Sequence, residues 1–280
     1  MKRYLSVEEL RKDFPTAFKA TGDVDFTDVP GAGQIAELPE NWAVERDVLL
    51  TGMPALREIP NGLSVGRRFM LEYCNSIVTL PADISVGKVI SVSHCPSFER
   101  IPDGVSPSYS LTIYDCAKFS RLPSSVDVAW LALIDCPSLK NLPEKMVARK
   151  NFEACNCTSL QVLPPHLYVE EYMNISGCTE LRKIPDELNL KSSLIMRNCP
   201  KVEELPANLR LGRHLDISGS TGIKEIPSNA EIGGGIIVRG CKGVRIPENV
   251  ADGYPKIVGE ANSDYEIARS PDAEITCPAP

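Results

Sequence analysis

The chain has 280 residues and a formal net charge of −7, and 43% of its residues are hydrophobic. This balance is typical of a soluble globular protein and excludes wholesale disorder. The longest apolar run, from Ala129 to Ile134, is far shorter than the roughly 20 residues of a membrane-spanning helix. The 23 prolines argue against long helices, because proline lacks a backbone donor and clashes with the preceding helical turn.

The N-terminal segment predicts a short helix followed by a strand. The run Ser6-Val7-Glu8-Glu9 has the spacing of a capping box, and the helix that it opens is expected to end before Pro15. Val24 and Phe26 alternate with acidic residues, which indicates a short strand. We expect this segment to cover the open end of whatever follows it.

A Leu-Pro or Ile-Pro pair recurs along most of the chain, with eight spacings of 21 residues and two of 20. Its prolines are Pro39, Pro60, Pro81, Pro102, Pro123, Pro143, Pro164, Pro185, Pro206, Pro227 and Pro247. Self-similarity at such a period indicates a solenoid of stacked repeats.

Two apolar columns lie two residues apart in every repeat. They begin with Val48 and Leu50 and end with Ile236 and Val238. Apolar residues at i and i+2 with a variable residue between them predict a short strand with one buried face. After each Leu-Pro pair, a short alternation such as Leu63-Ser64-Val65 predicts a second extended arm.

Cysteine occupies one further column of the repeat, three residues after the second apolar column. The members are Cys74, Cys95, Cys116, Cys136, Cys157, Cys178, Cys199 and Cys241, with Met53 and Ser220 in the remaining repeats. We interpret the column as a buried, reduced ladder that satisfies backbone groups where each strand turns into a loop. Oxidation stays open, because neighbouring strands lie near the Cα separation of a disulfide. Cys155 falls in an outward position and is expected to be more accessible.

The pattern apolar-x-apolar-x-x-Cys-x-x-apolar-x-x-Leu/Ile-Pro resembles the leucine-rich repeat. Its short period and its Leu-Pro pair are similar to the repeats of bacterial secreted effectors, including effectors that carry a ubiquitin-ligase domain. The Cys-x-x-Leu-x-x-Leu-Pro portion also resembles repeats of plant immune receptors. The sequence departs from the general motif after the cysteine, where x-x-apolar replaces x-Leu, and in the position of the first leucine. The resemblance implies a protein-binding surface on a concave sheet.

We therefore expect a flat, β-rich, right-handed solenoid: a leucine-rich repeat of about ten 20–21-residue repeats with a helical N-terminal cap. Residues 1–37 are assigned to this cap, 38–250 to the leucine-rich repeat solenoid, and 251–280 to a C-terminal cap and acidic tail. Seven acids and two bases between Glu248 and Pro280 give this end most of the net charge. The last residues are expected to be disordered.

No arrangement of residues predicts catalysis. The run from Gly62 to Gly66 matches the G-x-S-x-G elbow of hydrolases, but it overlies an ordinary arm of the repeat, where a strand-to-helix turn would be needed. His214, Asp216 and Ser218 alternate on one strand in an order that places Asp between the other two, whereas a triad needs His there. The three histidines occupy different columns and give no metal spacing. We predict a protein that is not an enzyme, with no catalytic residues, no metal site and no cofactor.

The outward residues of the first strand in each repeat are the expected binding surface. The predicted partner-binding residues are Tyr114, Trp130, Ile134, Glu153 and Tyr172, which fall on four adjacent strands. Aromatic residues with a charge nearby have the composition of an interface hot spot. Alternatively, Trp130 fills a gap left by a one-residue deletion in its own repeat.

Two functional interpretations follow. The preferred one is a protein–protein interaction scaffold that binds a protein partner on the concave sheet, with the resemblance implying a bacterial effector that acts in a host cell. The alternative is the substrate-recognition part of a ubiquitin ligase-type enzyme whose catalytic domain is absent from this chain. The near-neutral charge outside the acidic tail gives no footprint for nucleic acid. The protein is expected to be a monomer, located in the cytoplasm or secreted into a host cell without a Sec signal peptide, because Met1 to Pro15 has no apolar stretch.

Overall fold

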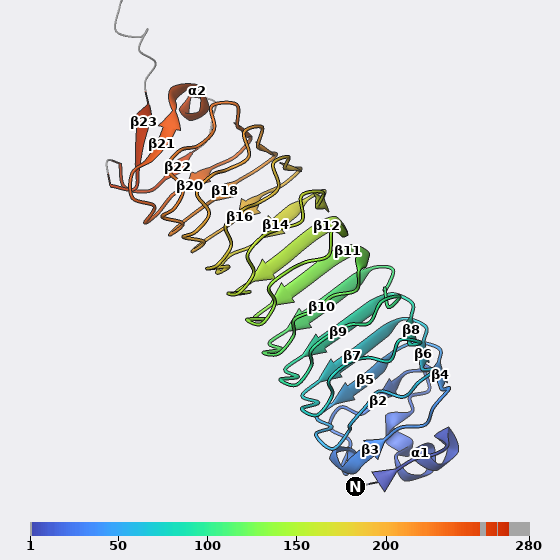
Figure 1. The fold of residues 1–280 in the computed structure, drawn as a ribbon. Coiled ribbons are helices and arrows are strands. Elements are labelled where there is room, and N and C mark those ends of the chain that lie inside the picture. Colours follow the sequence, from blue (N-terminus) through green and yellow to red (C-terminus); the bar gives the residue numbers. More distant parts are fainter. Residues whose placement is uncertain (1, 253–255, 262, 269–280) are drawn as a thin grey trace, which may run out of the picture.

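The computed structural model describes residues 2–252, 256–261 and 263–268. The chain forms an elongated parallel β-solenoid of about 11 turns, in which successive coils stack along one axis (Figure 1). The two helices among the described residues, α1 (Val7–Asp13) and α2 (Glu248–Ala251), lie near opposite ends of the coil. Neither the length nor the hydropathy of these helices would allow them to span a bilayer.

One long sheet runs the length of the solenoid, and each coil contributes one strand to its main path. The strands are β2 (Val24–Asp25), β5 (Val48–Thr51), β7 (Arg68–Glu72), β9 (Val89–Ser93), β10 (Ser110–Tyr114), β11 (Ser125–Ile134), β12 (Lys145–Cys155), β14 (Tyr172–Asn174), β16 (Leu194–Ile195), β18 (Leu215–Asp216), β20 (Ile236–Ile237) and β22 (Ile257–Val258). All neighbours on this path pair in parallel, and Phe69, Ile90 and Leu111 are successive partners. The predicted strand of every repeat is therefore present in register.

The second extended arm of the repeat forms shorter sheets on the other side of the coil. Its strands are β4 (Ala43–Val44), β6 (Ser64–Val65), β8 (Ser85–Val86), β13 (Tyr168–Val169), β15 (Asn189–Leu190), β17 (Arg210–Leu211) and β19 (Glu231–Ile232). In the repeat after β8, Pro107 stands where β8 has Val86, and this described arm forms no strand. Proline explains the interruption because it cannot donate to the ladder.

The shorter spacing between Pro123 and Pro143 changes the shape of one coil. With one residue fewer, the arm and the sheet strand merge into the single ten-residue strand β11. Its partner β12 keeps the additional residue as an irregularity, because Val128 pairs with Ala148 but Trp130 pairs with Asn151. The shift returns Trp130 to the register of the long sheet.

The core lies between the long sheet and the arms. In β7, Phe69 and Leu71 are fully buried, whereas Arg68, Met70 and Glu72 face outward. Repeats also pack by side-chain stacking, as in Phe98 and Phe119, whose ring centroids lie 5.9 Å apart. The inward–outward alternation predicted from the two apolar columns is confirmed.

The N-terminal segment contains the predicted helix and strand. Ser6 Oγ accepts a hydrogen bond of 3.2 Å from Glu9 N at the start of α1, whose Leu10 is buried in the core. The strand predicted from Val24 and Phe26 is β2, which pairs with β5. Three further short elements complete this segment: β1 (Lys2–Arg3), β3 (Ile35–Glu37), which pairs with β1, and the 3-10 turns Pro15–Ala17 and Ala32–Gln34.

The coil continues beyond Pro247, where the sequence pattern ends. Ile257 pairs with Ile236, and Tyr265 in β23 (Tyr265–Ala268) pairs with Val244 in β21 (Val244–Pro247). Both pairs keep the 21-residue spacing although the Leu-Pro signal is lost. Gly259 replaces the second apolar residue of the strand, since a Cβ there would meet the Val238 side chain at 2.9 Å. The end of the predicted acidic tail, with Cys277, lies outside the described residues.

The cysteine column forms a ladder of buried, free thiols. Each donates toward a carbonyl of the preceding coil; Cys178 Sγ, for example, lies 2.9 Å from Ala154 O. Ser220 occupies the same column, and its Oγ donates to Met196 O at 2.6 Å. Burial raises the pKa of the Cys199 thiol to about 11, so the protonated, donating form dominates. The role that the column members share is therefore donation to the neighbouring coil.

Substitution of Cys178 tests this role. Cys178→Ala leaves the buried Ala154 carbonyl without its donor, and we expect it to lower the free energy of unfolding by about 1–3 kcal/mol in urea titration. Cys178→Ser keeps a donor of the kind that Ser220 provides, and should cost clearly less. Equal losses for the two variants would show that the thiol acts only by filling space.

Candidate functional site

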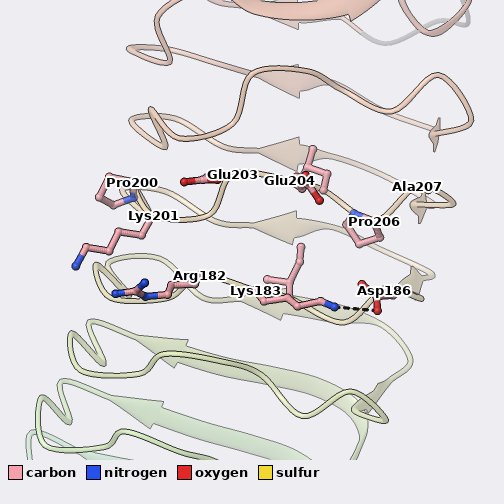
Figure 2. Close-up of a pocket in the computed structure, with 11 residues that line it drawn as sticks. Arg182, Lys183, Asp186, Pro200, Lys201, Glu203, Glu204, Pro206 and Ala207 are labelled. Carbon is pink, nitrogen blue, oxygen red and sulfur yellow. Dashed lines mark hydrogen bonds and ion pairs between the residues drawn. The ribbon is translucent and has the colours of Figure 1, made fainter.

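The hollows on the arm side of the coil carry paired charges. Figure 2 shows one of them between two neighbouring coils, where Lys183 Nζ lies 3.0 Å from Asp186 Oδ2. Lys201, on the next coil, forms an ion pair of 2.6 Å with Glu180. In the part of the chain that the structure describes, no group of three or more His, Cys, Asp or Glu residues is placed to hold a metal ion. This hollow therefore presents a solvated, charge-balanced surface.

The G-x-S-x-G sequence belongs to the arm. Ser64 lies in strand β6, which pairs with β4 and β8 and is followed by a further strand of the long sheet. Gly62 adopts a φ of +67°, and a Cβ on Gly66 would overlap the carbonyl oxygen of Glu45 on the preceding coil. These glycines are explained by backbone conformation and close approach of coils, because only glycine tolerates both.

His214, Asp216 and Ser218 do not form a triad. Asp216 Oδ1 accepts hydrogen bonds from Ser218 N and Ser218 Oγ, and Asp216 Oδ2 accepts from Arg197 Nε at 2.6 Å. His214 Nδ1 accepts instead from Gly235 N at 2.7 Å. Two coils earlier, Asn174 makes the same pair of bonds to Ser176 N and Oγ. The arrangement is thus a repeated turn of the backbone.

The structure places all five predicted binding residues on the outer face of the long sheet. Trp130 and Tyr172 lie near the beginning of their strands, on either side of Asn151, with which both pair. Tyr114 and Ile134 pair directly with each other at the ends of β10 and β11. The two groups are about 13 Å apart at the rise of a strand. They form one face with two separate apolar patches.

Trp130 does not fill an interior gap. Its side chain faces outward, and the residue is 38% exposed. The deletion in its repeat is absorbed by the merging of the arm and sheet strands of β11. The interpretation of Trp130 as a filler of that gap is wrong, and its exposure calls for another explanation.

Glu153 influences the groups around it. Burial raises the pKa of Tyr172, and the nearby Glu153 carboxylate raises it further. Burial, with a second contribution from Glu153, likewise raises the pKa of the half-buried Cys155 thiol to about 11. Negative charge is therefore felt across β12 and β14, between the two apolar patches.

Sequence analysis missed two residues that lie beside this face. Tyr73 and His94 follow the ends of β7 and β9 and have φ values of +53° and +51°. Their rings stack with centroids 4.6 Å apart, and the His94 ring meets the edge of Tyr114 at 5.1 Å. The column before the cysteines could have revealed them, because glycine, asparagine or aspartate fills it in the other repeats.

Comparisons with protein-family models, curated proteins and solved structures gave no match to this chain. The case for a function consequently depends on the geometry of the outer face and on the residues that it exposes.

The raised pKa of Cys155 gives a test of this geometry. At pH 8 the folded protein holds little thiolate at Cys155, so alkylation by iodoacetamide should be roughly 100-fold slower than in urea, and it should accelerate as the pH rises toward 11. Rates are read from the modified peptide by mass spectrometry. Glu153→Gln should speed the folded-state reaction. A rate equal to that of the unfolded chain would contradict the described environment.

Proposed function

We propose that this chain is a non-enzymatic protein-interaction module of the leucine-rich-repeat type, which binds a protein partner on the outer face of the long sheet. The observation that carries the proposal is the exposure of two large aromatic side chains, Tyr114 and Trp130, on paired strands of this face. Aromatic residues in such positions supply much of the energy of protein interfaces. Ile134, Glu153 and Tyr172 complete the proposed contact surface.

The backbone of this surface supports the proposal. Each strand from β7 to β12 is paired on both sides, so its outward residues are held at fixed spacing. A surface that is ordered before binding loses little conformational entropy when a partner docks. The half-buried Tyr172 and Ile134 are held further by their neighbours, which favours them as anchors.

The leucine-rich-repeat type is supported by the 21-residue period and by the ladder of buried donors. Within this proposal, α1 and the elements around it act as a cap that shields the apolar end of the first coil. The resemblance to the repeats of bacterial secreted effectors extends the proposal to an effector whose partner is a protein of a host cell.

The proposal is tested by capture of partners with a double variant, Trp130→Ala/Tyr172→Ala. Loss of two hot-spot residues should weaken capture at least 30-fold, because each such residue typically contributes about 2 kcal/mol or more. Circular dichroism and the urea unfolding midpoint establish that the variant is folded.

A matched control keeps the number of lost aromatic and apolar groups similar. Tyr168 and Val162 are both exposed but lie outside the outer face of the long sheet. Tyr168→Ala/Val162→Ala should leave capture unchanged. Undiminished capture by Trp130→Ala/Tyr172→Ala would overturn the proposal.

A further inference from the structure

A patch of three stacked rings lies at the end of the outer face where the strands turn into loops. Tyr73, His94 and Tyr114 come from three successive coils and touch in a row, and we call them the aromatic rim. Tyr73 is 50% exposed and Tyr114 is 37% exposed. The rim is continuous with the proposed contact surface through Tyr114, whose strand neighbour is Ile134.

Tyr73 and His94 occupy a position that is unfavourable for their residue types. The residue before the cysteine column has a positive φ, and the other coils place Gly, Asp or Asn there, as at Gly52, Asp115 and Asn156. These are the residues that tolerate the left-handed region, whereas a bulky aromatic residue there is strained. Burial does not compensate for the strain at Tyr73, because half of the residue is exposed to solvent.

Negative charge surrounds the rim. Glu72, Asp115, Asp135 and Glu153 lie on the outward positions of β7 to β12 or directly after these strands. Among the described residues, none of the four forms an ion pair with lysine or arginine, and Asp115 pairs only with His94, at 2.8 Å. The acidic groups therefore face solvent without a permanent cationic partner.

The charge is polarised along the strands. Arg67 and Lys88 precede β7 and β9 at the opposite edge of the sheet, and Arg68 is held by Asp47 Oδ2 at 2.6 Å. Negative charge is thus concentrated at the edge that carries the rings. The combination of exposed aromatic faces and unpaired carboxylates is complementary to a cationic side chain that has an apolar stem.

We infer that the aromatic rim, with Glu72 and Asp115, binds an arginine- or lysine-bearing peptide segment of the partner. The inference rests on the proposed function and names the chemistry of what is recognised. A guanidinium stacks on the exposed face of Tyr73 and donates to the carboxylates on either side of the rings. Its planar shape fits both contacts, which makes arginine the preferred residue.

The binding of fluorescein-labelled hexa-arginine, measured by anisotropy at 150 mM salt, tests the inference. Wild type should bind it, should bind hexa-lysine more weakly, and should not bind hexa-glutamate. Tyr73→Asn/His94→Asn places the residue of Asn156 and Asn198 in the same column, and should weaken hexa-arginine binding at least tenfold. The same variant should unfold at an equal or higher urea concentration, because it relieves the strained positions. Its loss of binding then cannot be attributed to misfolding.

A charge-matched pair separates recognition from general attraction. Glu72→Gln/Asp115→Asn removes two charges beside the rim and should weaken binding at least tenfold. Glu203→Gln/Glu204→Gln removes two exposed charges on the arm side, and should change binding by less than twofold. Equal weakening by the two acid pairs, full binding by Tyr73→Asn/His94→Asn, or no binding by wild type would each overturn the inference.

Partner capture distinguishes this failure from failure of the proposed function. If Trp130→Ala/Tyr172→Ala loses the partner while Tyr73→Asn/His94→Asn retains it, the inference is overturned and the proposed function stands. If both double variants lose the partner, both are supported. If neither loses it, both are overturned.

Discussion

The parallel pairing of each coil with the next, at a spacing of 20 or 21 residues, is the constraint on which the rest of the structure depends. It sets Phe69, Ile90 and Leu111 in one row of the core, and it brings each buried thiol to a carbonyl of the coil before it. Close backbone approach at Gly66 follows from the same stacking. Each coil is stabilised mainly by its two neighbours, as expected for a solenoid.

The same constraint separates what is fixed from what is free. Inward columns hold apolar residues or a small donor in nearly every coil, since any other residue would disturb two neighbours at once. The outward positions carry no such requirement, so Trp130, Glu153 and Tyr172 vary from strand to strand on a rigid sheet. Tyr73 and His94 extend this freedom to a turn position whose backbone favours other residues. Recognition is expected where side chains are exposed and held in place, and both apolar patches and the aromatic rim meet these conditions.

Much of the fold could be predicted from the sequence because the signal is repeated. The alternation at Val48 and Leu50 recurs in every repeat, so strand position, buried face and the donor role of the cysteine column followed from averaging. Features that occur once were missed. The merged strand β11 depends on one deleted residue and a compensating shift in β12, and the last coil at Ile257 lacks both the proline and the second apolar residue. The five predicted site residues lie on one face, but their division into two patches and the stacking of Tyr73 on His94 depend on register and ring orientation, which no spacing encodes.

Residue-resolved amide hydrogen exchange tests the stacking of coils most directly. The account predicts that slowly exchanging amides of the long sheet recur at intervals of 20 or 21 residues, from Val24, which donates to Asp47 O, to Ile236 and Val238, which donate to Lys256 O and Val258 O. Slow exchange at Ile236 and Val238 would establish the coil beyond the last Leu-Pro pair. Exchange of these two amides at the rate of an unstructured chain, or protection without the repeat period, would contradict it.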